Sequence, residues 1–184
     1  TATFYSISNC QDGLSRVTLG NFLIKRVVFE IQEELPNIKN FGTLSPIPGF
    51  RDWFVNLDEK LVKNILGNIP LENISFLKSS SLKIGDTRII SNKNAIYKLV
   101  AHYLMNEKNS KQLPINDVCR FHLGNGAIID DIVINANISE VGFKRSFGVM
   151  VNYLYELKNI EKNHEEYINK KTTIISNKVK KLIQ

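Results

Sequence analysis

Apolar and polar positions along the chain follow two different periods, and the period changes several times. Strand-like alternation or short apolar runs occur at residues 2–8, 41–44 and 148–157. Apolar positions spaced three or four residues apart, typical of amphipathic helices, occur at residues 17–36, 51–66, 94–108 and 158–182. The pattern therefore predicts strands that alternate with helices.

Two stretches lack a clear helical period. Residues 118–136 read as extended chain interrupted by a turn at "GNG", because glycine punctuates an otherwise apolar run. Residues 68–93 are rich in serine and asparagine and are expected to form a loop. Since we find no internal repeat and no second apolar core, the pattern predicts a mixed sheet flanked by helices, of class α/β or α+β.

Length and charge limit the classes of function that the chain can have. At 184 residues and 21.0 kDa the chain is large enough for one domain with a substantial core. Of the net charge of +6, the region from Lys158 onward carries +4, from seven lysines against three glutamates. The basic character is thus mainly that of the last helix, and no interleaving of aromatic and basic residues marks a nucleic-acid surface. No apolar run is long enough to span a membrane, so a soluble protein without nucleic-acid or membrane partners is expected.

The two cysteines, Cys10 and Cys119, show neither metal-ligand spacing nor a disulfide framework. We interpret both as reduced thiols in an intracellular protein and expect no metal site.

The first candidate site is the junction of the first strand and first helix. A strand, the turn "NCQDG" and a helix that begins at "VTLGN", with Thr18 as its cap, would present free backbone N–H groups to an anion. Gln11 and Gly13 lie on the turn, and Gly20 would allow a phosphate to approach the backbone. Simple turn formation explains such a unit equally well, so the pattern alone leaves both interpretations open.

Ser45 is the second candidate, in the loop-like sequence "TLSPIPGF". Pro46 has no N–H and restrains the preceding residue to extended geometry, so the serine is held at the end of a strand. A rigid loop at a strand end is a common place for functional groups. The alternative is a polar residue that only terminates the strand.

His122, in "RFHLGNGA", is the third candidate. The neighbouring glycines and Asn125 suit a polar pocket, although a histidine between two apolar residues is more often structural. Tyr153 and Tyr155 share one face of the later strand, because alternate residues of a strand point the same way. Each would usually be a core aromatic with a paired hydroxyl.

Several blocks together resemble a known family. "FYSISNCQDGL", "LGNFLIKRVV", "LSPIPGF", "LVAHYLMNEK", "FHLGNGA" and "SFGVMVNYLY" resemble, in the same order, blocks of malonyl-CoA decarboxylase, over residues 4–155. The resemblance implies a catalytic domain (residues 1–157, followed by a lysine-rich helix over 158–184) with a fold like that of GNAT acetyltransferases. It also implies that the family's N-terminal helical domain and the early strands of that sheet are missing.

The resemblance also implies residue roles. Ser45 and His122 match the family's catalytic serine and histidine, and Tyr155 matches a tyrosine in their hydrogen-bond network. The coenzyme A part of the substrate would bind at Gln11, Gly13, Arg16, Val17, Thr18, Leu19, Gly20 and Asn21, with Asn125 as a further binding residue. Thr18 and Asn137 stand where the family usually has acidic residues, which departs from its pattern.

The implied reaction is decarboxylation of malonyl-CoA to acetyl-CoA and CO2, with no cofactor because coenzyme A is part of the substrate. Two alternatives remain: a truncated or degenerate coenzyme A-binding domain without turnover, and an acyl-CoA-dependent acyltransferase. The full-length protein is expected to form a homo-oligomer. A cytoplasmic location is expected, or a mitochondrial one if an upstream signal is missing. The C-terminal "KKLIQ" lacks the Ser-Lys-Leu peroxisomal signal.

Overall fold

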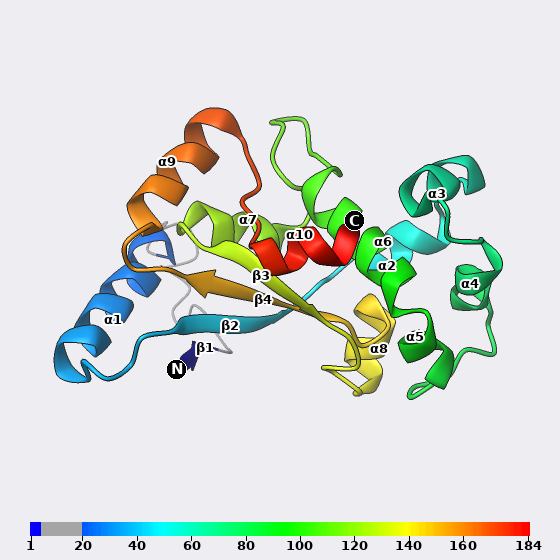
Figure 1. Cartoon of the computed structure of the whole chain (residues 1–184), viewed down its shortest axis with the longest axis horizontal. Helices are drawn as coiled ribbons and strands as arrows, with labels where there is room; N and C mark the ends of the chain where they lie inside the picture. The colour runs from blue at the N-terminus through cyan, green and yellow to red at the C-terminus, as the bar shows by residue number, and fades with distance from the viewer. Residues whose placement is uncertain (5–19) are drawn as a thin grey trace, which may run out of the picture.

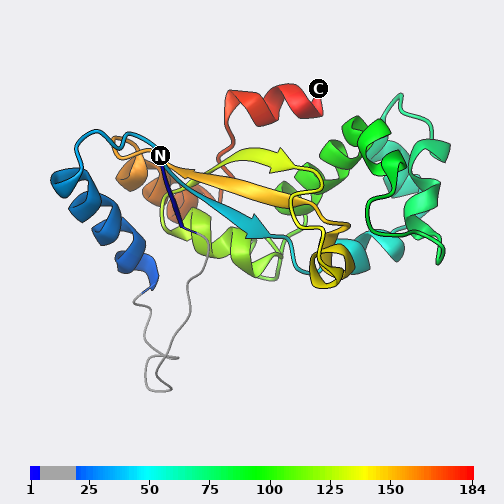
Figure 2. The same cartoon turned by 90° about the horizontal axis from the view of Figure 1, so that it is seen from below.

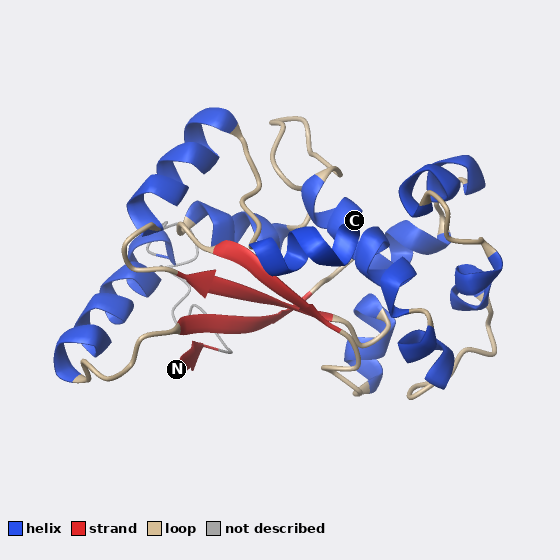
Figure 3. Ribbon diagram, viewed as in Figure 1, coloured by secondary structure: helices blue, strands red, loops and turns tan. Residues whose placement is uncertain are grey.

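A four-stranded mixed sheet forms the centre of the molecule (Figure 3). The computed structural model describes residues 1–4 and 20–184. The strands β1 (Ala2–Phe4), β2 (Phe41–Pro46), β3 (Ile128–Val133) and β4 (Met150–Tyr155) lie in the order β1-β2-β4-β3. β1 runs parallel to β2, and the other neighbours are antiparallel. The predicted class, a mixed sheet flanked by helices, is confirmed.

Helices cover both faces of this sheet. On one side α7 (Asp117–Gly124) packs against α1 (Gly20–Glu34) and α9 (Ile160–Lys170). Figure 2 shows α10 (Asn177–Ile183) on the opposite side, where it packs on β3 and α6 (Lys93–Met105). α7 therefore lies on the same side of the strands as α1 and α9, which form one end of the molecule in Figure 1.

The remaining helices gather at the other end of the sheet (Figure 1). They are α2 (Phe50–Val55), α3 (Glu59–Leu66), α4 (Glu72–Ser75), the 3-10 turn η2 (Phe76–Lys78), α5 (Thr87–Ser91) and α8 (Glu140–Ser146). One cluster of buried apolar side chains runs through the molecule, from Val28 on α1 through Phe41 and Leu99 to Val179 on α10. Within the part of the chain described, no helix is long and apolar enough to cross a membrane.

Two predicted helices are each interrupted. The helix expected over 51–66 divides at Asn56, because the Asp58 carboxylate accepts hydrogen bonds from the backbone of Lys60 and Leu61 and starts α3 anew. The tail expected as one helix over 158–182 divides into α9 and α10. Ser176 caps α10, and the intervening chain forms a bridge between Ile175 and Ile129 of β3. Each second helix begins at a side-chain cap, Asp58 or Ser176, which the apolar period does not reveal.

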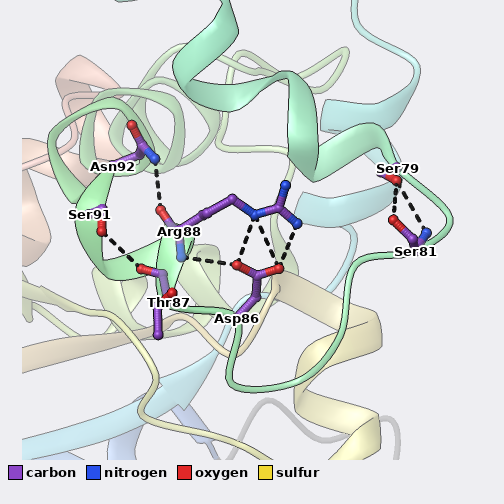
Figure 4. A network of polar contacts seen from close by, with 7 residues as sticks. All are labelled: Ser79, Ser81, Asp86, Thr87, Arg88, Ser91 and Asn92. Atoms are coloured by element: carbon purple, nitrogen blue, oxygen red, sulfur yellow. Dashed lines mark hydrogen bonds and ion pairs between the residues drawn. The ribbon is translucent and has the colours of Figure 1, made fainter.

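Residues 68–93, predicted to form a loop, instead contain three short helical segments. Figure 4 shows how local polar contacts stabilise the last of them. The Asp86 side chain accepts from the Arg88 backbone N–H at 3.0 Å and caps α5, while the Arg88 guanidinium donates to the same carboxylate at 2.7 Å. These contacts are exposed and join residues close together in the sequence. They explain why the segment is helical, and no functional role is needed to explain them.

The strand boundaries differ modestly from those expected. β2 extends two residues past the predicted end and includes Ser45 and Pro46. β4 is shorter than the apolar run over 148–157. Of the strand predicted at 2–8, β1 covers Ala2–Phe4, and the rest lies outside the described residues.

Candidate functional site

Three elements bring polar side chains together at the face of the sheet beneath α7. β2 and β4 are antiparallel, with Thr43 opposite Tyr153, Ser45 opposite Val151, and Phe41 opposite Tyr155. Because alternate residues of a strand share a face, Thr43 and Ser45 point to the same side as the two tyrosines. α7 carries His122 onto that side.

Ser45 and His122 are in direct contact. Ser45 Oγ lies 3.0 Å from Nε2 of His122, a hydrogen-bonding distance between residues 77 positions apart in the sequence. Only 6% of Ser45 and 5% of His122 is exposed. The interpretation of Ser45 as a simple strand terminator is wrong, because the ladder continues to Pro46, which pairs with Met150. Pro46 ends the strand instead, where a missing N–H is tolerated.

The segment around His122 corrects a prediction. Residues 118–124, part of the stretch expected to be extended, lie in α7. The Asn116 side chain accepts from the Cys119 backbone N–H at 2.9 Å and caps the helix, and Cys119 and Leu123 lie buried on its inner side. Cys119 and Leu123 are four residues apart, a helical spacing hidden in a short apolar run. His122 consequently sits in the last turn of a helix rather than on a strand.

The other ring nitrogen of His122 meets Tyr155. Nδ1 lies 2.7 Å from the Tyr155 hydroxyl oxygen, so the histidine bridges a serine and a tyrosine. Tyr153 stacks on the imidazole with ring centroids 4.3 Å apart and planes 23° apart. These contacts fix both the position and the plane of the imidazole ring.

Burial sets the protonation of this group. It lowers the pKa of His122 to about 3, because an imidazolium ion in an apolar environment loses its hydration. The same loss of hydration raises the pKa of the Tyr155 phenol above its ordinary value. At neutral pH the site therefore holds a neutral imidazole between two neutral hydroxyls, and within the described residues no carboxylate is hydrogen-bonded to the ring.

Asn125, predicted to bind substrate, follows α7 directly. It is fully buried, and its side-chain Nδ2 donates to the carbonyl of Phe121 at 2.7 Å. Its Oδ1 has no hydrogen-bond partner among the described residues. The side chain therefore helps to close the end of the helix that carries His122, and a role in binding stays a prediction.

The predicted coenzyme A loop falls mostly outside the described part of the chain. Gln11, Gly13, Arg16, Val17, Thr18 and Leu19 lie there, as does the cap predicted at Thr18. Gly20 and Asn21 open α1, as expected for the first turn of that helix. Asn137, the other departure from the family pattern, lies in the loop before α8, where its Oδ1 accepts from the Ser139 hydroxyl at 2.7 Å.

Sequence reasoning missed one member of the site. Thr43 is buried, and its Oγ1 lies 3.0 Å from Ser45 Oγ. The signal was available, since a residue two positions before Ser45 on the same strand must share its face. Thr43, Ser45, His122 and Tyr155 thus form one hydrogen-bonded series, which we call the β2–α7–β4 series.

Comparison with known proteins identifies relatives along the whole chain. The family described as Malonyl-CoA decarboxylase C-terminal domain matches residues 1–184. Among curated proteins, mitochondrial malonyl-CoA decarboxylase of Anser anser anser is 36% identical over 189 residues, covering 93% of this chain and 37% of the relative. The Rattus norvegicus protein of the same name is 35% identical over 200 residues, covering 99% and 40%.

Solved structures of malonyl-CoA decarboxylase match the fold as well. That from Rhodopseudomonas palustris has a TM-score of 0.82 and 37% identity, covering 99% of this chain and 42% of its own. That from Agrobacterium vitis has a TM-score of 0.82 and 36% identity, covering 99% and 45%. The chain therefore spans less than half the length of these relatives.

Proposed function

The chain belongs to the malonyl-CoA decarboxylase family, and on that premise we propose that it is a carboxy-lyase that converts malonyl-CoA to acetyl-CoA and CO2. The observation that supports this proposal most directly is the hydrogen-bonded contact of Ser45, His122 and Tyr155. Ser45 and His122 would act on the reacting atoms, and Tyr155 would hold the imidazole.

The chemistry of the reaction suits such a neutral site. The bond between the carboxylate carbon and the methylene carbon breaks, and its electron pair moves onto the thioester as CO2 leaves. The thioester oxygen then carries the negative charge of an enolate, which needs a hydrogen-bond donor. A serine hydroxyl can donate this hydrogen bond to the enolate oxygen. A cationic side chain at the same place would also stabilise the ground-state carboxylate and so oppose the loss of CO2.

The enolate must finally receive a proton on carbon. His122 is neutral in the free site because burial lowers its pKa to about 3. An anionic substrate next to the ring would raise that pKa, since a nearby negative charge favours the imidazolium. The proton taken up with the substrate would then pass from Nε2 to the enolate carbon. This balances the reaction, which consumes one proton for each malonyl group decarboxylated.

The two alternatives make different demands on the site. A degenerate domain is distinguished by its lack of turnover, because hydrogen-bonded Ser45 and His122 can be buried at little cost with or without a reaction. Acyl transfer to an amine needs a base to take the acceptor's proton, and an imidazole with a pKa of about 3 is a weak base. The change at Asn137 does not by itself favour the degenerate domain. Its amide oxygen accepts the hydrogen bond from Ser139 that a carboxylate oxygen would accept.

Substrate and assembly are part of the same proposal. Malonyl-CoA would carry its own coenzyme A, so no separate cofactor would be required. The loop around Gln11 and Gly20 would bind the pyrophosphate, and the full-length protein would assemble as a homo-oligomer.

We propose a cytoplasmic location, which the free thiol of Cys119 suits, whereas the goose and rat relatives are mitochondrial by name.

The test is acetyl-CoA formation from malonyl-CoA by the purified protein and by its Ser45→Ala and His122→Gln variants. Loss of the donor or of the proton source should lower kcat at least about 100-fold. Matched controls are Ser91→Ala, which changes an exposed serine on α5, and His102→Gln, which changes a histidine on α6 whose Nε2 lies 3.4 Å from Oε1 of Glu107. Both should keep the activity of the unchanged protein.

A binding measurement separates the alternatives. Calorimetric titration of coenzyme A into the Ser45→Ala variant should show binding, since the serine would act on the acyl group. If the folded protein binds coenzyme A but gives no acetyl-CoA, the degenerate domain is the correct interpretation. Full activity in Ser45→Ala would overturn the proposed role of the serine.

A further inference from the structure

Thr43 has a buried hydroxyl whose hydrogen bond leads to Ser45. Only 1% of the residue is exposed, and its Oγ1 lies 3.0 Å from Ser45 Oγ. We propose that Thr43 is a positioning residue: its Oγ1 accepts the Ser45 O–H and so orients Ser45 Oγ to accept a hydrogen bond from Nε2 of His122. This inference rests on the function proposed above and assigns a new role within it.

Packing alone does not require a hydroxyl at this position. Thr43 lies on the inner face of β2, opposite Tyr153 and between the buried Phe41 and Ser45. Valine has nearly the same shape and would bury without the cost of desolvating a hydroxyl. Within the described residues Ser45 is the side chain to which Thr43 is hydrogen-bonded. The hydroxyl is therefore best explained by its contact with the serine.

The β2–α7–β4 series allows two directions of donation, because each hydroxyl has one proton and a neutral imidazole has one N–H. In the first, Thr43 donates to Ser45, Ser45 to Nε2, and Nδ1–H to the Tyr155 oxygen. In the second, Tyr155 donates to Nδ1, Nε2–H to Ser45, and Ser45 to Thr43. The distances are compatible with both.

The chemistry of the tyrosine end favours the second direction. A phenol is a stronger acid than an aliphatic hydroxyl, and an imidazole nitrogen is a better acceptor than a phenol oxygen. The distance of 2.7 Å between the Tyr155 oxygen and Nδ1 is short, as expected for a strong hydrogen bond. Tyr155 is also buried, and among the described residues Nδ1 of His122 is the acceptor within hydrogen-bonding distance of its hydroxyl.

This direction has a consequence for the serine. Because Nε2–H donates to Ser45 Oγ, the hydroxyl proton of Ser45 is not used in the hydrogen bond to His122. In the free protein Ser45 donates this proton to Thr43 Oγ1 in a hydrogen bond. When an enolate or carboxylate oxygen arrives, the same O–H can rotate from Thr43 to that oxygen. Thr43 Oγ1 can then turn its own O–H towards Ser45 Oγ, so the hydrogen bond between the two hydroxyls is kept in the transition state and holds Ser45 Oγ in place.

The kinetic test compares Thr43→Val with Thr43→Ser. We expect Thr43→Val to lower kcat about tenfold, the size of one hydrogen bond in the transition state, with KM for malonyl-CoA within about twofold of the original. Thr43→Ser, which keeps the hydroxyl, should restore most of the rate. An unchanged kcat in Thr43→Val, or an equal loss in Thr43→Ser, would overturn the positioning role.

The second test does not depend on turnover. In the protein labelled with ¹⁵N-histidine, the ring shifts distinguish the Nε2–H from the Nδ1–H tautomer. We expect His122 as Nε2–H in the free protein, and the Nδ1–H form would overturn the direction of donation. If the protein shows no decarboxylase activity but has the Nε2–H tautomer, the proposed function fails while the hydrogen-bond direction stands.

Discussion

Gly126 lies so close to α9 that a Cβ atom added to it would stand 2.2 Å from the carbonyl oxygen of Ile160. The turn that contains it also receives two hydrogen bonds from α9. Asn163 Nδ2 donates to the Gly126 carbonyl at 3.2 Å, and His164 Nδ1 donates to the Gly124 carbonyl at 2.6 Å. Since this turn follows the last turn of α7, α9 holds the end of the helix that carries His122.

Gly126→Ala should therefore destabilise the protein strongly. Its φ of +80° already costs alanine about 1 kcal/mol, and the contact with Ile160 forces the backbone to shift. We expect the free energy of unfolding in urea to fall by about 3 kcal/mol or more. The matched control is Gly85→Ala, whose φ is +79° and whose added Cβ would meet nothing within 4 Å. It should cost about 1 kcal/mol, and equal losses in the two variants would contradict the close contact.

The burial of His122 predicts a specific dependence of stability on pH. Its pKa of about 3 in the folded protein lies below the ordinary value of 6.5, so protons bind preferentially to the unfolded chain. Stability from this residue is fully present above pH 6.5 and is lost as the pH falls from 6.5 towards 3. Below pH 6.5 the free energy of unfolding should drop by about 1.4 kcal/mol per pH unit from this group alone.

The measurement is urea unfolding of the unchanged protein and of His122→Gln at several pH values between 5 and 8. Glutamine does not titrate, so the variant should lack this slope while it keeps the slopes of all carboxylates. The difference between the two free energies should be constant above pH 7 and shrink below it. Parallel curves across the whole range would show that His122 gains its proton equally well in the folded state.

Much of the sheet was predictable because its strands have regular patterns. β4 alternates buried and partly exposed residues, and Tyr153 and Tyr155 share one face, as the period of two predicts. The sequence predicts β2 but ends it at Leu44, because the prolines that follow suggest a break. In the structure, pairing with β4 extends the ladder through Ser45. Pairing across the sheet depends on residues far away in the sequence, which a local pattern does not contain.

The contact of Ser45 with His122 was suggested by resemblance to a family and not by periodicity. α7 was missed because its few turns end in glycines that also fit a turn between strands, and its cap is the single residue Asn116. Thr43 was overlooked because a threonine in a strand is ordinary until the register places its hydroxyl beside Ser45. Short helices and hydroxyl contacts are therefore the features that required the structure.

Two buried tyrosines offer a test of what Tyr155 contributes. Its hydroxyl is hydrogen-bonded to Nδ1 of His122, whereas the hydroxyl of Tyr167 on α9 has no partner among the described residues. Tyr155→Phe leaves Nδ1 without its donor inside the protein, so we expect about 1–2 kcal/mol less stability and a kcat lower by about tenfold. Tyr167→Phe removes only an unpaired buried hydroxyl and should change stability by less than about 0.5 kcal/mol, with kcat unchanged.

Urea unfolding and initial rates with malonyl-CoA on both variants carry out the comparison. The pair controls for the loss of a buried phenol oxygen, because both rings stay in place and both hydroxyls are removed from the interior. A lower kcat in Tyr155→Phe at unchanged KM would mean that the tyrosine acts through the imidazole and not on substrate binding. Equal behaviour of the two variants would contradict the role of Tyr155, since its hydrogen bond to His122 is what distinguishes it from Tyr167.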